Sequence, residues 1–186
     1  SKNTSDRVWS QEPWCTVLSE TSFAEGDAAS FLERAVKFVN EKVWGTLCAT
    51  LIVHPSTLAD PAGKAAVEKA IMDLKYGAVV VNTWGGAVFG LGVAHWGGHP
   101  SSKLQDIQSG LGWVHNTFLL EGIEKMVLRA PAKAFPISPW FPGHRTQDVL
   151  ARRLVDFEMS PSWLKIPGIA VAGMKYSHKE FVTKRG

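Results

Sequence analysis

Two short apolar runs, residues 46–53 (TLCATLIV) and 78–82 (AVVVN), constrain the fold more than any other feature of this sequence. Neither run alternates between apolar and polar residues, which is typical of strands covered on both faces in a parallel sheet. Between them, Asp60 and Pro61 form a helix start signal, and apolar residues recur at helical spacing as far as Tyr76. A strand, a helix and a second strand at this spacing predict an α/β fold with parallel pairing.

The other expected elements follow from the same patterns. They are a strand over 14–20, a helix from Asp27 to about Glu41, a short helix over 114–125, a strand over 125–131 and a helix over 146–158. Residues 1–10 are polar and are expected to be frayed, residues 131–144 are rich in proline, and Pro167 with Gly168 interrupts the last apolar segment. We therefore predict an open, mostly parallel sheet with helices on both faces within residues 1–130, followed by a Pro-rich linker and helical extension over 131–186.

Composition argues against several classes of function. The net charge is +3 and the cationic residues are spread along the chain, so nucleic-acid binding has little support. Cys15 and Cys48 form no C-x-x-C pair and no zinc spacing, which favours a reducing cytoplasm. The sequence holds no apolar run of the roughly 18 residues that a membrane helix needs, and we expect no membrane partner. Eight tryptophans indicate large buried or pocket-lining aromatic surfaces.

The stretch 79–98, VVVNTWGGAVFGLGVAHWGG, is rich in glycine and follows a predicted strand. A dinucleotide fingerprint needs G-x-G-x-x-G opening a helix, but here Gly90 and Gly92 are followed by His95 and no helical pattern. The glycines are better explained by an extended loop that passes close to a site at the carboxyl ends of the strands. A flexible surface loop is the alternative.

Five short motifs stand in order along the chain: Glu12-x-Trp14, Asn40 with Trp44-Gly45, Gly77-x-Val79-x-Val81-Asn82, Trp96-Gly97-Gly98 and Ser109-Gly110-x-Gly112. Over about residues 9–130 this order resembles the C-terminal part of the aldehyde dehydrogenase superfamily. Members carry E-x-F-G-P-V, a helix ending in A-N-x-x-x-Y-G-L, then G-x-V-x-V-N, P-F-G-G and S-G-x-G. The chain departs from this pattern at Cys15-Thr16, at His95, and in having tryptophan for phenylalanine at two motif positions.

The resemblance implies specific site residues. Glu12 would accept hydrogen bonds from the nicotinamide ribose hydroxyls of NAD or NADP, because two adjacent hydroxyl donors match two carboxylate oxygens. Trp14 would border the nicotinamide ring. The substrate funnel would be lined by Asn82, Trp84, Phe89 and Trp96. Residues 125–129 resemble the family's strand that joins a partner subunit's sheet, so a homo-oligomer is expected.

The activity that the resemblance implies is oxidation of an aldehyde to an acid through a cysteine thioester. The family's nucleophilic cysteine, general-base glutamate and cofactor-binding domain lie upstream of the E-x-F motif. The chain would thus be a C-terminal fragment, inactive alone, whose partner is a missing N-terminal region. Two alternatives stay open: an acyl-CoA or acyl-phosphate reductase of the same superfamily, and a non-catalytic assembly module.

The cysteines and histidines of the chain are predicted to be structural. Cys15 and Cys48 are interpreted as inert thiols buried in strands, because the sequence shows no cation or helix N-terminus that would lower a thiol pKa beside them. His95 and His99 lie four residues apart, but Gly97 and Gly98 make a helical metal pair improbable. We expect neither a metal site nor a catalytic residue in this chain.

Overall fold

The computed structural model describes residues 6–23, 26–133, 137–139, 141 and 143–174. The chain divides into two compact units, Ser1–Ala132 and Lys133–Gly186, and each unit is described by itself. In the described part of the chain, no helix is both long enough and apolar enough to cross a membrane.

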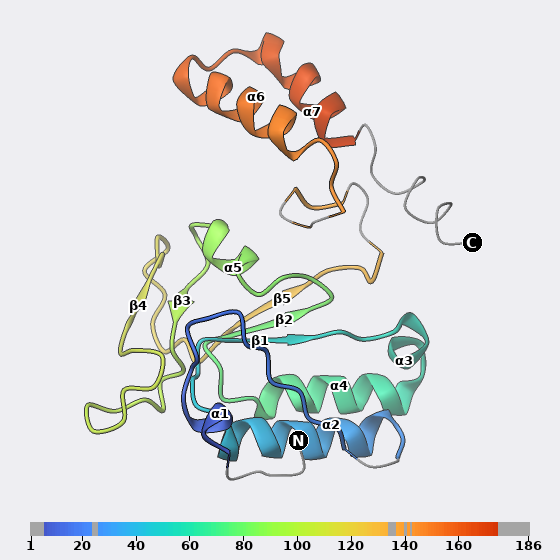
Figure 1. The fold of residues 1–186 in the computed structure, drawn as a ribbon, viewed down its shortest axis with the longest axis vertical. Helices are drawn as coiled ribbons and strands as arrows, with labels where there is room; N and C mark the ends of the chain where they lie inside the picture. The colour runs from blue at the N-terminus through green and yellow to red at the C-terminus, as the bar shows by residue number, and fades with distance from the viewer. Residues whose placement is uncertain (1–5, 24–25, 134–136, 140, 142, 175–186) are drawn as a thin grey trace. The chain divides into compact units, whose positions relative to one another are not determined.

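The first unit is built on an open sheet of three parallel strands in the order β1-β2-β5 (Figure 1). These strands are β1 (Cys48–Leu51), β2 (Ala78–Val81) and β5 (Met126–Arg129). Cys48 pairs with Ala78, which in turn pairs with Met126. Every residue of β2 is buried, as expected for a central strand. The structure therefore has the predicted α/β character, with a small parallel sheet.

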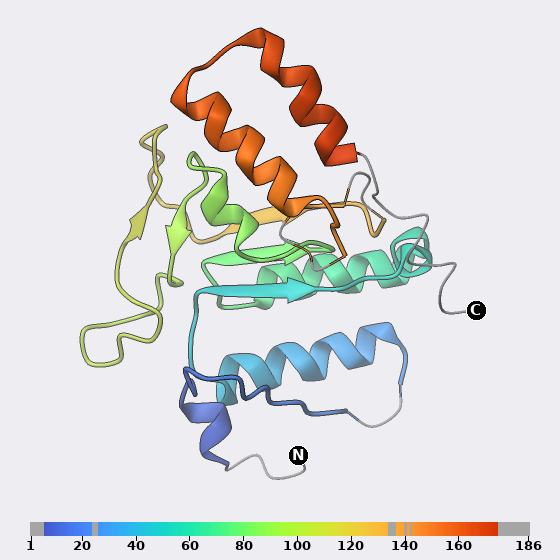
Figure 2. The same ribbon diagram turned by 45° about the horizontal axis from the view of Figure 1, so that its top comes forward.

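Two long helices cover one face of this sheet (Figure 2). They are α2 (Ala28–Lys42) and α4 (Pro61–Asp73), and both match the predicted helices. The carboxylates of Asp27 and Asp60 cap them by accepting backbone hydrogen bonds from Ser30 (2.8 Å) and Gly63 (2.7 Å). A one-turn helix, α3 (Pro55–Ala59), precedes α4. The main core lies between these helices and the sheet, with Leu32, Val36, Val67, Ile71, Val79 and Val81 among its buried residues.

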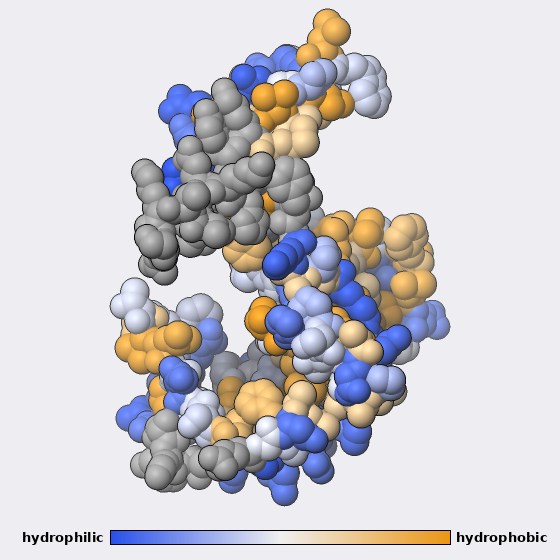
Figure 3. Space-filling view, turned by 90° about the vertical axis from the view of Figure 1, so that its right-hand side faces the viewer, coloured by the Kyte–Doolittle hydropathy of each residue, from blue (hydrophilic) through white to orange (hydrophobic). Residues whose placement is uncertain are grey.

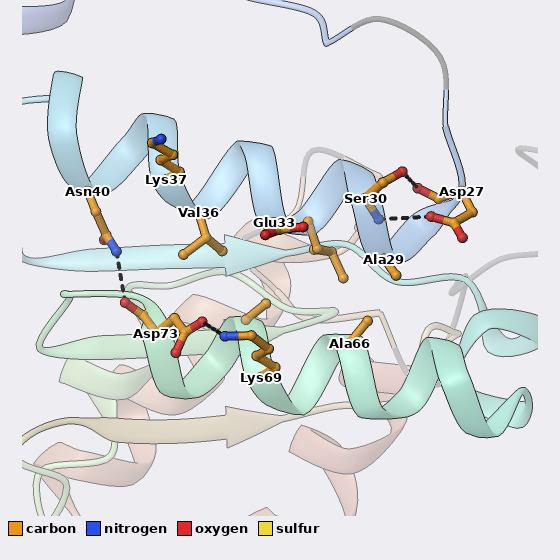
Figure 4. Close-up of a pocket in the computed structure, with 12 residues that line it drawn as sticks. Asp27, Ala29, Ser30, Glu33, Val36, Lys37, Asn40, Ala66, Lys69 and Asp73 are labelled. Carbon is orange, nitrogen blue, oxygen red and sulfur yellow. Dashed lines mark hydrogen bonds and ion pairs between the residues drawn. The ribbon is translucent and has the colours of Figure 1, made fainter.

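Asn40, which belongs to the second sequence motif, joins the ends of the two long helices. Its Nδ2 donates to the carbonyl oxygen of Asp73 at 2.8 Å (Figure 4), and its Oδ1 accepts from the backbone N–H of Lys75 at 2.9 Å. Asn40 thus satisfies two backbone groups where α4 leads into β2, which explains an asparagine at this place.

A groove of about 650 Å³ runs between α2 and α4.

The opposite face of the sheet has a thinner cover. The four-residue helix α5 (Ala87–Gly90) and the segment leading to β3 (Trp96–Gly97) lie over it. Ala78 and Val80 pack there with Val88 and Ala94. The prediction of helices on both faces therefore holds only in this limited form, because the long helices lie on one face.

The predicted strand over 14–20 is wrong. Residues 11–23 have no regular structure, and Trp14 has a left-handed backbone with φ +45°. Leu18 is 93% exposed. The segment has strand-like residues, but in the described structure no neighbouring strand pairs with it, so it forms no strand. Before this segment, α1 (Arg7–Ser10) replaces part of the expected frayed start, because Trp9 is buried against Phe38 with ring centroids 5.1 Å apart. Residues 1–5 lie outside the described residues.

The predicted helix over 114–125 is also wrong. The segment begins with β4 (Trp113–Val114), which pairs antiparallel with β3, and then follows turns. His115 and Leu119 have φ values of +66° and +52°, which an α-helix does not allow. Asn116 fixes the turn instead, because its side chain bonds both backbone groups of Leu120 (2.7 and 3.0 Å).

The strand predicted over 125–131 is present as β5. It pairs with β2 on one side and forms an edge of the sheet, so the expected pairing with a partner subunit stays a prediction. Met126 and Leu128 pack against the α5 side of the sheet, while Arg129 reaches Glu68 of α4 at 2.8 Å. These contacts hold β5 on both faces of the sheet.

The second unit contains α6 (Gln147–Met159), as predicted, followed by a 3₁₀ turn, η1 (Trp163–Lys165), and α7 (Ile166–Met174). Pro167 does not interrupt the segment, since it occupies the first turn of α7, where a missing N–H costs nothing. The Thr146 hydroxyl donates to the carbonyl oxygen of Ala172 at 2.6 Å and ties the two helices together. The described residues of 131–144 form turns without regular structure, as expected.

Lys125 provides a test of how α4 is held to the sheet. Its Nζ is placed to donate to the carbonyl oxygens of Ile71, Met72 and Leu74 (3.2, 2.7 and 2.7 Å), and its side chain is 10% exposed. We predict that Lys125→Met lowers the free energy of unfolding in urea by about 2 kcal/mol, because it removes charged hydrogen bonds from helix-end carbonyls. Lys69→Met, which removes an exposed ion pair with Asp73, is the control and should cost less than about 0.5 kcal/mol. Equal losses in the two variants would contradict this role.

Candidate functional site

Asn82 follows β2 at the carboxyl edge of the sheet, where the resemblance places the funnel. Its backbone is left-handed, with φ +60°, a conformation that asparagine tolerates better than most residues. Its Oδ1 accepts from the backbone N–H of Val53 at 2.7 Å, which ties the ends of β2 and β1 together. Its Nδ2 is buried without a hydrogen-bond partner among the described residues. Asn82 therefore has a structural role at this edge.

Two of the predicted funnel residues lie in contact, and a third ring joins them. The Phe89 ring on α5 meets Trp96 of β3 edge-on, with centroids 5.9 Å apart. His115 packs against the same Phe89 at 4.7 Å. We call Phe89, Trp96 and His115 the aromatic cluster. Trp84, the fourth predicted funnel residue, lies between β2 and α5 and is 53% exposed.

His115 is the member of the aromatic cluster that sequence reasoning missed. Its left-handed backbone turns its ring toward Phe89, and its Nδ1 is buried with no partner among the described residues. The sequence carried no signal for this placement, since the apolar pattern around it indicated a helix. An Asn-Thr pair after a histidine is compatible with both a turn and a helix.

The predicted cofactor residues are exposed. Glu12 and Trp14 lie in the irregular segment 11–23, and Trp14 is 85% exposed. Cys15 is exposed as well, so its prediction as a thiol buried in a strand is wrong. Cys48 is in β1 and packs against the core, and burial raises the pKa of its thiol, which is the opposite of an activated nucleophile.

The glycines of three separate motifs meet at the amino edge of the sheet. A Cβ on Gly77 would overlap the carbonyl oxygen of Gly97, and one on Gly97 would overlap the carbonyl oxygen of Gly112. A Cβ on Gly98 would lie 2.8 Å from the carbonyl oxygen of Gly110. We call these five residues the glycine cluster. Close backbone packing requires glycine at Gly77, Gly97 and Gly98, whereas Gly110 and Gly112 have positive φ values (+108° and +76°) that favour glycine. The cluster lies at the opposite edge from the one that the sequence led us to expect.

Polar side chains of the loop 99–110 fix this loop to the start of β1. The Ser109 hydroxyl accepts from the backbone N–H of Thr46 at 2.8 Å, and Gln108 Oε1 accepts from that of Gly45 at 2.7 Å. The backbone N–H groups of Gly77 and His99 both donate to the carbonyl oxygen of Thr46 (2.8 and 3.1 Å). The Trp-Gly, G-x-V, W-G-G and S-G-x-G motifs thus form one packed unit.

His99 lies between a serine and a glutamate, an arrangement that invites comparison with a hydrolytic triad. Ser101 Oγ is 2.8 Å from His99 Nδ1, and Glu124 Oε1 is 3.4 Å from His99 Nε2. However, Nδ1 already accepts from the backbone N–H of Ser101 at 3.2 Å. The contact is therefore a local turn, and His99 is not placed to act as a base toward Ser101.

A second His-Pro-Ser sequence in the same chain supports this interpretation. At the start of α3, His54 Nδ1 lies 2.7 Å from Ser56 Oγ and accepts from the Ser56 backbone N–H at 3.2 Å. The same geometry thus arises from the same three residues at an exposed helix start. In the described residues, no group of three or more His, Cys, Asp or Glu side chains is placed to hold a metal ion.

His95, which replaces the family's proline, is 3% exposed, and neither ring nitrogen has a hydrogen-bond partner among the described residues. Its ring packs against that of Trp113 in a tilted arrangement, with centroids 4.9 Å apart and an interplanar angle of 40°. Burial lowers the pKa of this imidazole from its usual value of 6.5, so His95 is neutral at pH 7. His95 immediately precedes β3 and contacts Trp113, whereas Trp96 contacts Phe89.

This burial predicts a pH dependence of stability. Below pH 6.5 the unfolded chain takes up a proton at His95 that the folded chain takes up only at lower pH. The contribution of His95 to the free energy of unfolding should be level above pH 6.5 and should fall below it, by at most about 1.4 kcal/mol per pH unit. We expect His95→Phe to remove that part of the slope in urea titrations at several pH values, and His54→Phe to retain it. An unchanged slope in His95→Phe would count against the buried neutral imidazole.

The glycine cluster predicts a second pair of variants. Gly97→Ala should lower the free energy of unfolding by about 1–3 kcal/mol, because its Cβ has no room beside the Gly112 carbonyl and the Trp113 backbone (3.0 Å). Gly90→Ala is the matched control, since a Cβ there meets nothing within 4 Å. It should be neutral or stabilising by up to about 1 kcal/mol. Similar stability of the two variants, measured by urea unfolding, would contradict the close packing.

Comparisons with known proteins return no match: no family model, no curated protein and no solved structure matches this chain. The resemblance to aldehyde dehydrogenases therefore depends on the five motifs and on how their residues are arranged.

Proposed function

We propose that this chain is the C-terminal part of an NAD- or NADP-dependent enzyme of the aldehyde dehydrogenase type, which oxidises an aldehyde to an acid. A cysteine outside this chain would attack the carbonyl carbon and form a thioester that water then hydrolyses. NAD or NADP, when bound, would supply the hydride acceptor. The chain would contribute a ribose-binding carboxylate, part of the substrate funnel and the sheet that supports them.

The convergence of the motifs carries this proposal. Five separate glycines, chosen only for their order along the sequence, pack against one another, and Asn40 of a further motif joins α2 to the α4–β2 connection. Chance matches to short patterns would have no reason to form one unit. The aromatic cluster supports a funnel for an apolar aldehyde on the α5 side of the sheet.

The cofactor part of the proposal depends on Glu12 and Trp14. The Glu12 side chain is exposed, so its two oxygens are open to a pair of ribose hydroxyls, and Trp14 is exposed two residues later. Burial of such an exposed aromatic side chain against a ligand or another domain would be favourable. These residues therefore fit a nicotinamide nucleotide that is held between this chain and the missing cofactor-binding region.

A non-catalytic assembly module is the second candidate. Many large apolar side chains are exposed, among them Leu18 at 93% and Leu119 at 83%. Figure 3 shows orange apolar atoms between blue hydrophilic ones on one face of the molecule. Exposed apolar surface of this kind favours contact with another protein or another domain. In the enzymatic proposal the cofactor-binding region would make that contact, and in the second candidate the partner of the assembly module would make it.

The two candidates differ in activity. We predict that the native protein, captured from its source with an antibody raised against this chain, reduces NAD or NADP when an aldehyde is added. In that protein, Glu12→Gln should raise the KM for the nucleotide about tenfold with a smaller effect on kcat, because it weakens charged hydrogen bonds to the ribose. Glu41→Gln, an exposed carboxylate on α2, is the control and should leave the KM unchanged.

A captured protein that reduces neither nucleotide with any of a set of aliphatic and aromatic aldehydes would contradict the enzymatic proposal. It would leave the assembly module as the better account.

A further inference from the structure

A small pocket lies beside the glycine cluster, on the face of the β3–β4 pair that carries His95. Its volume is about 190 Å³, and His95, Trp113, Leu111, Ile123 and Pro100 are among the residues that line it. It is separate from the aromatic cluster, whose members do not line it. We call it the His95 pocket. No part of the proposed activity uses it.

The unpartnered imidazole of His95 points to a ligand. A buried polar group without a hydrogen bond costs about 1–3 kcal/mol, so native structures rarely keep one without a reason. Both ring nitrogens of His95 are buried and have no hydrogen-bond partner among the described residues, and the residue is only 3% exposed. Phenylalanine would fill the same space beside Trp113 without the cost of unpaired ring nitrogens. A ligand in the pocket that forms a hydrogen bond with His95 would remove that cost.

The lining of the pocket selects an uncharged ligand. Among the described residues that line it there is no lysine, arginine, aspartate or glutamate. His99 also lines it, but both of its ring nitrogens already have partners in Ser101 and Glu124. A charged molecule would lose its hydration without gaining a counter-charge, which disfavours it strongly.

The shape and chemistry of the walls narrow the class further. The Trp113 ring and the side chains of Leu111 and Ile123 favour a flat apolar body. A neutral imidazole has one N–H donor and one acceptor nitrogen, and a primary carboxamide can serve either of them. We propose that the His95 pocket binds a small, uncharged aromatic carboxamide or lactam, which stacks near Trp113 and forms a hydrogen bond with His95.

Three probes of nearly equal shape test the proposal: benzamide, benzoate and benzamidinium, which differ in charge. Each is titrated into the ¹⁵N-labelled chain, and the amide signals of Gly110, Gly112 and Trp113 and the imidazole nitrogens of His95 are followed by NMR. Benzamide should bind saturably with a dissociation constant of about 0.1–1 mM, which is ordinary for so small a molecule. Benzoate and benzamidinium should bind at least tenfold more weakly.

Two variants locate the binding. His95→Phe keeps the ring but removes both nitrogens, and Leu111→Trp fills the pocket without altering His95. Each should weaken benzamide binding at least tenfold, while the control His54→Phe, at the exposed His-Pro-Ser turn, should not change it. An amide spectrum that retains the wild-type dispersion shows that a variant is folded. If His95→Phe does not fold, Leu111→Trp still tests whether benzamide binds in this pocket.

Several results would overturn the proposal. The first is a lack of saturable benzamide binding, which would mean that the pocket holds only water. The second is that the charged probes bind as tightly as benzamide. The third is that benzamide still binds to both variants with unchanged affinity. Benzamide resembles nicotinamide, but Glu12 and Trp14, the proposed contacts of the nicotinamide nucleotide, do not line this pocket, so none of these results bears on aldehyde oxidation. Failure of this inference is thus distinguishable from failure of the proposed function.

Discussion

The close approach of the Gly77 and Gly97 backbones is the contact on which the rest of the first unit depends. It brings the W-G-G segment against the start of the central strand β2, and Gly97 in turn receives the carbonyl of Gly112. A side chain at either position would separate these segments. Because Thr46 binds the same loop through its N–H and its carbonyl oxygen, the starts of β1 and β2 and the long loop are held as one piece.

This arrangement gives the two edges of the sheet different characters. The amino edge is closed by backbone packing and by Lys125, which gathers the carbonyls at the end of α4. The carboxyl edge and the α5 side carry the left-handed Asn82 and the aromatic cluster, with a thin cover of one short helix. The proposed funnel residues thus lie on the carboxyl edge and on the side of the sheet with the thinner cover.

The sequence predicted the parts of the fold that depend on local signals. Asp27 and Asp60 are capping residues at helix starts, and the uninterrupted valines of β2 indicate a strand buried on both faces, so these elements were predicted correctly. The errors arose where distant contacts decide. WCTVLSE has strand-like residues but no strand to pair with, and the apolar residues around 114–125 follow turns because Asn116 closes a loop on itself. The role of His95 could not be predicted either, since its burial depends on Trp113, far along the chain.

The central claim is that this chain is one part of a longer enzyme, and the mass of the native polypeptide tests it most directly. The chain itself has a mass of 20.3 kDa. An antibody raised against it, used on extracts of the source cells, should detect a polypeptide several hundred residues long, with room for a nucleophilic cysteine and a cofactor-binding domain upstream of Glu12. A native polypeptide of about 20 kDa would contradict the claim.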